Sequence, residues 1–468
     1  MHIAVIGAGP GGYAAAFLAA DLGMKVTLID SEANPGGVCL YRGCIPSKAL
    51  LHVAKLIDES RHAKKWGVEF GEPKIDLAQL RGFKEDVVKK LTSGVGQIAK
   101  FRKVEYLQGR AAFENSTTLR VTGTDGTTQD RSFDRIVIAT GSRPAIIPSL
   151  RLDTPRMMDS TGALNLKDKP NTLLVIGGGY IGLELGTVYA ALGTKVSVVE
   201  MTPGLLPGAD RDLVLPLHKR METIFESIML NTTVTAVKEE ANGIRVSFDG
   251  AEVKEREKVF DKVLVSVGRK PNSEIEGLDK TRVQVIQRGF IKVNKQLQTD
   301  DPAIYAIGDV VGEPMLAHKA SHEGRTAVEA IAGHKVAFEP NAIPAVVFTD
   351  PEIAWAGLTE TQAQKDGRGI KVAKFPWAAS GRAITLDRPE GLTKLILDPA
   401  TERVLGVGIV GSGAGELIAE GVLAIEMGAL AKDIALTIHP HPTLSETLME
   451  SAEVFFGTST HVYRPKRN

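Results

Sequence analysis

Near its start the chain reads Ile3-Ala4-Val5-Ile6-Gly7-Ala8-Gly9-Pro10-Gly11-Gly12. The apolar run predicts a buried strand, and the glycines after it predict a tight turn that leads into a helix. The same pattern returns 170 residues later (177 − 7) as Leu173-Leu174-Val175-Ile176-Gly177-Gly178-Gly179-Tyr180-Ile181-Gly182. A strand, a glycine turn and a helix, used twice, predict two dinucleotide-binding units of βαβ design.

Three glycines have distinct tasks in such a unit. The first permits the tight turn, the second lets a pyrophosphate approach the backbone, and the third lets the helix pack closely on the strand. The helix N-terminus then offers free N–H groups and a partial positive charge to phosphate. These glycines are Gly7, Gly9 and Gly12 in the first unit and Gly177, Gly179 and Gly182 in the second.

Each unit continues into a predicted strand that ends in an acid, Lys25–Asp30 and Lys195–Glu200. The first glycine and the acid are 23 residues apart in both units (30 − 7 and 200 − 177). We expect both acids to accept hydrogen bonds from ribose hydroxyls. Because a carboxylate repels a 2′-phosphate, Glu200 favours NAD over NADP. Arg211 follows in a predicted loop, where an arginine is usually a solvated surface residue.

Cys39 and Cys44 are the only cysteines in the 468 residues. They lie where a helix is expected to begin after the first nucleotide unit, and a helix N-terminus stabilises a thiolate. A pair in a short loop also exchanges readily between a dithiol and a disulfide. Inert buried thiols are one alternative. Half of a metal site is a poor one, because no further Cys or His lies at ligand spacing nearby. The pair indicates thiol–disulfide redox chemistry.

A third polar group lies near the end of the chain, in His439-Pro440-His441-Pro442-Thr443-Leu444-Ser445-Glu446. A histidine oriented by a carboxylate is the usual arrangement for activating a thiol. We expect Glu446, at a predicted helix start, to orient His441, with His439 as a structural neighbour. The alternative is that these histidines only shape a proline-rich turn.

Composition limits the class of protein. The length suggests roughly three domains. The 56 basic and 56 acidic residues balance, so charge gives no reason to expect nucleic acid or an anionic membrane as a partner. No run of about 18 apolar residues predicts a membrane span. Two cysteines do not form a secreted disulfide framework. We expect a cytoplasmic enzyme without a metal.

Further elements are predicted between and after the two units. A helix is expected over Asp76–Lys100, and strands over residues 118–122, 135–140, 262–267 and 303–307. The strands at 135–140 and 262–267 are followed by Gly141-Ser142-Arg143-Pro144 and Gly268-Arg269-Lys270-Pro271. From about Val346 the pattern changes to a β-like segment up to Gly357. A hairpin over 391–398 and 404–411 and helices over 414–427 and 445–455 follow, which predicts a third domain of α+β type.

These motifs together resemble the pyridine nucleotide–disulfide oxidoreductase family. The resemblance rests on Cys39–Lys48, the two glycine patterns, Ala139–Pro144, Tyr305–Asp309 and His439–Glu446, which occur in family order over nearly the whole chain. It implies an α/β fold with two Rossmann-like domains, for FAD and NAD, and a C-terminal α+β dimerisation domain. The implied boundaries are 1–145 for the FAD domain, 146–271 for the NAD domain, 272–345 for a region that completes the FAD domain, and 346–468 for the dimerisation domain.

The resemblance also implies roles for single residues. The FAD-binding set is Gly7, Gly9, Gly12 and Asp30 at the adenosine side, Asp309 at the ribityl–pyrophosphate region, and Thr140, Gly141 and Ala317. Lys48 is expected near the reactive flavin nitrogen, paired with Glu184. The alternative for Glu184 is an ordinary acid near the positive end of a helix. The NAD-binding set is Gly177, Gly179, Gly182, Glu200 and Gly268.

Within the family, the pattern Cys-x-x-x-x-Cys-Ile-Pro-Ser-Lys is similar to members that oxidise a protein-bound dihydrolipoyl group. The implied route starts when His441 takes a proton from the substrate dithiol. The substrate thiolate then attacks Cys39, and Cys44, nearer the flavin, passes the electrons on. NAD, bound on the opposite face of the flavin, takes the hydride.

The family also implies partners. The C-terminal domain would form a homodimer in which His441 serves the other subunit's cysteines. The substrate would arrive on the lipoyl domain of a 2-oxoacid dehydrogenase complex or on the glycine cleavage carrier protein. A reductase of the glutathione type with NADPH is the nearest alternative, and Glu200 argues against it. A flavoprotein that only binds a partner, without turnover, is the alternative outside catalysis.

Overall fold

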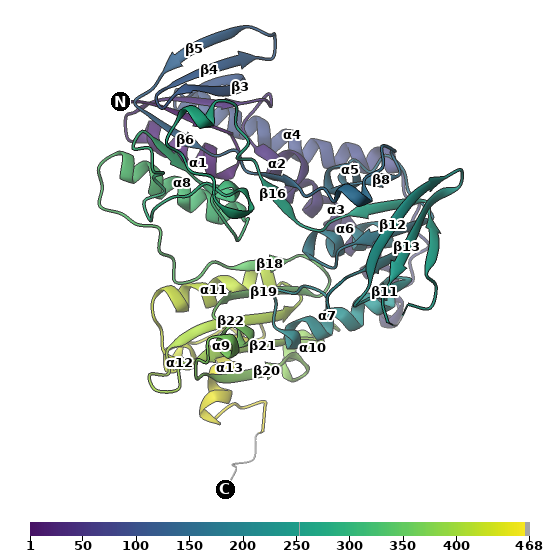
Figure 1. The fold of residues 1–468 in the computed structure, drawn as a ribbon. Coiled ribbons are helices and arrows are strands. Elements are labelled where there is room, and N and C mark those ends of the chain that lie inside the picture. The colour runs from purple at the N-terminus through teal and green to yellow at the C-terminus, as the bar shows by residue number, and fades with distance from the viewer. Residues whose placement is uncertain (252, 464–468) are drawn as a thin grey trace.

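A computed structural model of the chain describes residues 1–251 and 253–463; Glu252 and the last five residues of the predicted 346–468 domain lie outside the described residues. Three main sheets with their covering helices, and two smaller sheets, make up three lobes, here called the first, second and third lobe in chain order. Figure 1 shows the third lobe, in yellow and green, below the other two. None of the helices described is long and apolar enough to cross a membrane.

The first lobe is built on a seven-stranded sheet. Its strands, in spatial order, are β17 (Ile304–Ala306), β6 (Arg135–Ile138), β1 (His2–Ile6), β2 (Lys25–Asp30), β3 (Glu105–Asn115), β4 (Thr118–Gly123) and β5 (Thr128–Ser132). The pairs from β17 to β3 are parallel, and β3–β4–β5 are antiparallel. The central β1 is apolar and buried because helices cover a parallel sheet on both faces.

The helices of the first lobe come from two separate parts of the first 331 residues, one before the second lobe and one after it. They are α1 (Pro10–Asp21), α2 (Gly37–Arg42), α3 (Cys44–His62), α4 (Leu77–Phe101) and α8 (Ala317–Ile331), with short 3₁₀ turns η1 (Ala63–Trp66), η3 (Leu278–Lys280), η4 (Gln287–Gly289) and η5 (Gly308–Val310). α8 packs closely on α1, because a Cβ at Gly324 would lie 2.6 Å from the carbonyl oxygen of Gly11. The late segment β17–α8 is thus part of the first lobe.

The second lobe repeats the parallel design. Its five-stranded parallel sheet has the order β11 (Ser227–Met229), β10 (Lys195–Val199), β9 (Thr172–Ile176), β15 (Lys262–Val265) and β8 (Met157–Met158). A separate antiparallel sheet contains β12 (Thr233–Glu240), β13 (Gly243–Asp249) and β14 (Glu257–Phe260). The helices are η2 (Pro148–Leu150), α5 (Ser160–Leu164), α6 (Tyr180–Ala191) and α7 (Arg211–Ile224).

The two Gly-x-x-Pro segments meet where the chain passes between these lobes. β7 (Ser142–Pro144) and β16 (Arg269–Pro271) form a two-stranded antiparallel sheet, with Lys270 opposite Arg143. The outgoing and returning crossings therefore lie side by side (Figure 1). Two motifs that the sequence presents as a repeat are partners in space.

The third lobe holds an antiparallel sheet with helices. Its strands have the order β18 (Ala345–Val347), β19 (Glu352–Gly357), β22 (Val404–Gly411), β21 (Leu392–Leu397) and β20 (Lys371–Pro376). Its helices are α9 (Glu360–Lys365), η6 (Trp377–Ala379), α10 (Gly381–Thr385), α11 (Ala414–Glu426), α12 (Ala431–Leu436) and α13 (Glu446–Phe456). The predicted hairpin and two long helices are present. The β-like segment 346–357 forms two paired strands, β18 and β19, because the turn at Asp350-Pro351 divides it.

The second and third lobes share one apolar core. Leu213 and Leu217 of α7 belong to the same buried cluster as Ile353 of β19 and Val410 of β22. A Cβ added at Gly408 would lie 2.8 Å from Leu213. The strand β22 can therefore approach α7 closely because this residue is a glycine. The start of α7 is therefore fixed against the third lobe.

Candidate active site

The two glycine turns have the same geometry. Gly7 and Gly177 have φ values of +97° and +105°, which a side chain would strain. A Cβ at Gly12 would lie 1.8 Å from the carbonyl oxygen of Gly7, and one at Gly182 would lie 2.4 Å from that of Gly177. At the second glycine of each turn there is space, because a Cβ at Gly9 would meet no atom nearer than 3.9 Å and one at Gly179 none within 4 Å. Each turn is thus closed by the outer glycines and leaves its middle open to a ligand.

The acid after each turn also repeats its contacts. Asp30 accepts from the backbone N–H of Ala8 at 2.6 Å and of Glu32 at 3.0 Å. Glu200 accepts from Gly178 at 2.7 Å and from Thr202 at 2.8 Å. Each oxygen can accept more than one hydrogen bond, so both acids can still take a ribose hydroxyl. The two acids hold their own glycine turns as well as facing the place expected for a ribose.

A cavity between the first and second lobes collects the predicted FAD and redox residues. Its lining includes Gly7, Gly9, Gly12, Asp30, Cys39, Cys44, Lys48, Thr140, Gly141, Glu184, Asp309 and Ala317. They come from the β1–α1 turn and the start of α1, the end of β2, α2, α3, the segment after β6, α6, η5 and the start of α8. The space at Gly9, at a helix N-terminus, fits the pyrophosphate position that the sequence predicts.

The predicted NAD residues form a second group, on the second lobe. Gly177, Gly179 and Gly182 lie at the turn between β9 and α6, Glu200 directly follows β10, and Gly268 follows β15. All of them lie at the carboxyl ends of neighbouring parallel strands, which is where such sheets bind ligands. None of them lines the FAD cavity.

The two cysteines are chemically unequal. Cys44 is the first residue of α3, whereas Cys39 lies in the preceding α2. A hydrogen bond from the Cys39 thiol, opposed by burial and aided by the Lys48 ammonium, lowers the pKa of Cys44 to about 7. The same hydrogen bond, with burial, raises the pKa of Cys39. In the dithiol state Cys44 is therefore the thiol that ionises first, and Cys39 keeps its proton.

Lys48 and Glu184 form the ion pair that the resemblance implied. Lys48 Nζ lies 2.7 Å from Glu184 Oε2, and Glu184 is 3% exposed. Glu184 Oε1 accepts from the backbone N–H of Phe348 at 3.0 Å, and the Lys48 ammonium lies 4.4 Å from the centre of the Phe348 ring. Residues of all three lobes thus meet beside the cysteines. Sequence reasoning missed Phe348, since no local pattern marks it.

Asp309 has polar neighbours that the sequence did not reveal. Its carboxylate accepts from Ser142 Oγ at 2.5 Å, and Arg269 Nε donates to the same hydroxyl at 2.7 Å. The carboxylate of Glu323, 3% exposed, accepts from Gly308 N at 2.7 Å and so holds the turn that carries Asp309. Ser142 and Arg269 belong to the two Gly-x-x-Pro segments, which pair in the structure. The repeat of this motif was the one feature of the sequence that could have pointed to these two residues.

His441 and Glu446 form the predicted pair. His441 Nδ1 lies 2.9 Å from Glu446 Oε1, and Glu446 Oε2 accepts from Thr443 N at 2.7 Å. Burial works to raise the pKa of Glu446, but the Thr443 N–H and the His441 ring outweigh it and keep that pKa low. The His441 side chain is 72% exposed, and no residue of the 439–446 segment lines the cysteine cavity of its own chain.

The structure also decides the predictions for His439 and Arg211. His439 has a structural setting, because its ring nitrogens contact Thr437 O and a Glu420 oxygen, each at 2.8 Å. Arg211 is exposed, as expected of a surface residue, but it does not lie in a loop. It begins α7, and its guanidinium donates to the carbonyl oxygens of Leu205, Leu206 and Ala209. These carbonyl groups lie in the loop between β10 and α7, and the sequence does not reveal that they face Arg211.

Comparison with known proteins agrees with this arrangement. Residues 1–324 match the pyridine nucleotide-disulphide oxidoreductase family, and residues 343–452 match the dimerisation domain of the same family. The chain belongs to the pyridine nucleotide-disulphide oxidoreductases. It is therefore a flavin-dependent oxidoreductase that uses FAD and NAD, and its dimerisation domain supports a homodimer.

Similar proteins with curated names cover nearly the whole chain. A dihydrolipoyl dehydrogenase from Haemophilus influenzae is 52% identical over 99% of this chain and 97% of that protein. Relatives of the same name from Vibrio cholerae and Geobacillus stearothermophilus are 50% and 46% identical, over 99% and 98% of this chain and 98% and 97% of their own lengths.

Solved structures share the complete fold. LpdA from Mycobacterium tuberculosis superposes with a TM-score of 0.90 at 27% identity, over 97% of this chain and 99% of that chain. The HOCl-induced flavoprotein disulfide reductase RclA from Escherichia coli has a TM-score of 0.85 at 29% identity, over 96% and 98%. The α/β architecture with a C-terminal α+β domain is thus confirmed.

Proposed function

We propose that this chain oxidises a dihydrolipoyl dithiol to the disulfide and passes the two electrons through Cys39, Cys44 and FAD to NAD. One observation supports this most strongly. The unequal cysteine pair and the Lys48–Glu184 ion pair line the same cavity as the FAD-binding glycines. The names of relatives at up to 52% identity over the whole chain point to the same substrate.

The chain's residues divide the sulfur chemistry between them. His441, with Glu446 fixing its ring, accepts a proton from the substrate dithiol. The substrate thiolate attacks Cys39 in the Cys39–Cys44 disulfide, and Cys44 leaves as a thiolate. The second substrate sulfur then displaces Cys39, so the substrate leaves as a disulfide and the cysteines remain reduced. The Lys48 ammonium favours the ionised form of Cys44, so it helps Cys44 to leave as a thiolate. When bound in the cavity lined by Gly9, Lys48 and Asp309, FAD would supply the two-electron chemistry that links the dithiol to NAD.

The binding roles follow the lobes. We propose residues 1–145 and 272–345 for the FAD domain, since β17 and α8 join the sheet and helices of the first lobe. Residues 146–271 then bind NAD, with Glu200 selecting against a 2′-phosphate. Residues 346–468 form the interface with a second copy. Glu200 also disfavours the alternative, a glutathione-type reductase that uses NADPH.

We further propose that His441 acts on the cysteines of the other subunit. The imidazole is exposed and absent from the cavity of its own chain. Large apolar side chains are exposed nearby on the third lobe, among them Met427 (75%), Leu436 (69%) and Ile438 (95%). Such a surface fits a subunit interface that would also bring in the imidazole. The dithiol would then arrive at this joint on a lipoyl domain of another protein, either a 2-oxoacid dehydrogenase complex or the glycine cleavage carrier. The reducing cytoplasm suits a cysteine pair that cycles.

A steady-state assay tests the substrate and the coenzyme. The purified FAD-bound protein is compared with dihydrolipoamide plus NAD and with glutathione disulfide plus NADPH. We expect turnover with the first pair and little with the second. The Cys44→Ser variant should retain FAD and lose the dithiol-dependent activity. Turnover that prefers glutathione disulfide with NADPH would reject the proposed substrate.

A mixed dimer tests the shared site. Cys44→Ser and His441→Gln chains, each inactive alone, are unfolded together and refolded as a one-to-one mixture. If His441 serves the partner, each mixed dimer holds one complete site, and random pairing restores about a quarter of the wild-type activity. If His441 serves its own chain, every site in the mixture is defective and no activity returns.

A further inference from the structure

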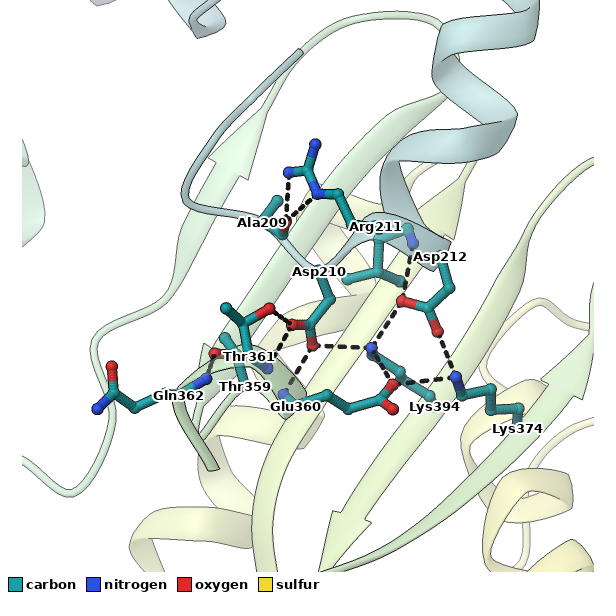
Figure 2. Close-up of polar contacts among 11 residues, drawn as sticks. Ala209, Asp210, Arg211, Asp212, Thr359, Glu360, Thr361, Gln362, Lys374 and Lys394 are labelled. Atoms are coloured by element: carbon teal, nitrogen blue, oxygen red, sulfur yellow. Dashed lines mark hydrogen bonds and ion pairs between the residues drawn. The ribbon is translucent and has the colours of Figure 1, made fainter. Parts of the chain in front are cut away.

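A buried charge cluster joins the second lobe to the third. Figure 2 shows Asp210 and Asp212 at the start of α7 facing Glu360 of α9, with Lys394 of β21 between them and Lys374 of β20 beside them. The three acids each place an oxygen within 4.8 Å of the others. Such a group could hold a metal ion, but its centre is already filled by an ammonium.

Lys394 occupies that centre completely. Its Nζ donates to Asp210 at 2.8 Å, to Asp212 at 2.8 Å and to Glu360 at 2.6 Å, so each ammonium hydrogen has a carboxylate acceptor. Lys394 is 1% exposed. Lys374 contacts two of the same acids from a half-exposed position, at 2.6 Å from Asp212 and 3.0 Å from Glu360.

Asp210 connects the two lobes through backbone as well as charge. Its carboxylate accepts from the N–H groups of Glu360 and Thr361, both at 3.0 Å, and from Thr361 Oγ1 at 2.8 Å. It therefore satisfies the free N–H groups at the start of α9 in the other lobe, although it directly precedes α7. Asp210 is 3% exposed, so these bonds are shielded from water.

The same segment leads back to the predicted NAD site. Arg211 donates to Leu205 O at 2.7 Å and to two further carbonyls of the loop between β10 and α7. In that loop, Leu206 N donates to Gly178 O at 3.0 Å, and Gly178 N donates to Glu200. Hydrogen bonds thus join the second glycine turn and its acid to Arg211, and the two residues on either side of Arg211, Asp210 and Asp212, hold the buried ammonium of the third lobe.

Neighbouring residues of β21 point to opposite faces of the sheet at this point. Lys394 points to α7, and the preceding residue, Thr393, points to the opposite face, as neighbours in a strand do. Thr393 is fully buried and contacts Thr447 of α13 at 2.8 Å, directly after Glu446. One strand therefore supports the NAD lobe on one face and the helix of the His441–Glu446 pair on the other.

We propose that Lys394 is a positioning residue for the nicotinamide coenzyme. Lys394 holds Asp210 and Asp212 against the third lobe. It thereby fixes the loop between β10 and α7, which begins at Glu200 and contacts the glycine turn at Gly178. This proposal rests on the assignment of Glu200 and that turn to NAD, and it adds a residue of the C-terminal domain to coenzyme binding. Lys394 itself touches neither coenzyme nor substrate.

The two half-reactions of the FAD-bound dimer separate this role from general stability. In Lys394→Met, flavin reduction by NADH is followed by stopped flow at increasing NADH to obtain the apparent Kd. Flavin reduction by dihydrolipoamide is followed separately without NAD. A loop displaced by less than an ångström should raise the apparent Kd for NADH about tenfold. The dihydrolipoamide reaction should stay within about twofold of wild type.

Thr393→Val is the matched control, because it changes an equally buried side chain one residue away that does not face α7. Its apparent Kd for NADH should stay within about twofold of wild type. Asp212→Asn is a milder second variant that keeps Lys394 in place, and it should raise that Kd about threefold. It decides the question if Lys394→Met does not retain FAD.

Results of two kinds would overturn the proposal, no effect on NADH binding and a general effect. One is an unchanged Kd for NADH in both Lys394→Met and Asp212→Asn. The other is an equal loss in both half-reactions, or an equal rise of the Kd in Thr393→Val, which would show only general destabilisation. A wild-type protein that is reduced by NADH but not by dihydrolipoamide would contradict the proposed substrate instead, and the NADH measurements would still test Lys394.

Discussion

Replacing Cys39 with alanine should shift the ionisation of Cys44. The Cys39 thiol makes the largest contribution to the low pKa of Cys44, about 7 against an ordinary 9.0. Burial acts against ionisation, and the Lys48 ammonium is the next group that favours it. Without the hydrogen bond from Cys39, burial and the ammonium oppose each other, so we expect the pKa of Cys44 to rise by at least about one unit.

The size of the effect follows from the thiolate fraction. A thiol with a pKa of about 7 is about half ionised at pH 7, and a thiol of pKa 8 is about one-tenth ionised. The sign is fixed because the thiolate is the reactive form, so reactivity that sets in near pH 7 in the wild type should set in near pH 8 or above in the variant. The low pKa also stabilises the reduced protein above pH 9, and this contribution disappears as the pH falls through about 7.

Alkylation measures the ionisation directly. The reduced, FAD-bound protein is treated with iodoacetamide between pH 5 and 10, and modification of the peptide that contains Cys44 is followed by mass spectrometry. Lys48→Met serves as the second variant and should shift the midpoint in the same direction by a smaller amount. A Cys39→Ala midpoint that stays at the wild-type pH would refute the view that the neighbouring thiol sets the pKa of Cys44.

Three further substitutions test other parts of the site. Gly12→Ala should give a chain without flavin absorbance, because the new Cβ would lie 1.8 Å from the Gly7 oxygen; a yellow protein would show that the turn can open. Glu446→Gln removes the charge beside His441 Nδ1 and should lower dihydrolipoamide turnover roughly 100-fold, with flavin reduction by NADH unaffected as the control. Lys394→Ala leaves three acids around an empty centre, so millimolar Ca²⁺ should raise the Tm of this variant and leave the wild type unchanged; a Tm that ignores Ca²⁺ would contradict a cation position there.

Local sequence patterns were sufficient for the elements that carry the site. The apolar runs before both glycine turns are β1 and β9, and the predicted helix over Asp76–Lys100 is α4, with Asp76 as its N-cap. Each of these elements is determined by residues close to one another in sequence. Hydrophobic periodicity and capping residues reveal such local preferences. The division of 346–357 into two strands was missed because the apolar residues on both sides of Pro351 read as one segment.

Contacts between distant segments could not be predicted in the same way. Lys394 is charged and stands in a strand that reads as apolar, and nothing near it in sequence indicates three acids from two other elements. Ser142 with Arg269, and Glu184 with Phe348, also meet only when separate lobes pack. The Lys48–Glu184 pair was found beforehand only because the family resemblance supplied it. Pattern reasoning thus located the chemistry, and the structure supplied the groups that position it.

The acid of each nucleotide unit is the point where binding and folding cannot be separated. Glu200 was expected to recognise a ribose, but both of its oxygens already hold backbone N–H groups, those of Gly178 and Thr202. Removing its charge would therefore free the glycine turn, and with it the loop that Arg211 and Asp210 fix to the third lobe. A change of this residue alone should lose affinity for NAD without gaining affinity for NADP. On this proposal, coenzyme choice depends on the hydrogen bonds that tie Glu200, Gly178 and Leu206 together as well as on the charge of Glu200.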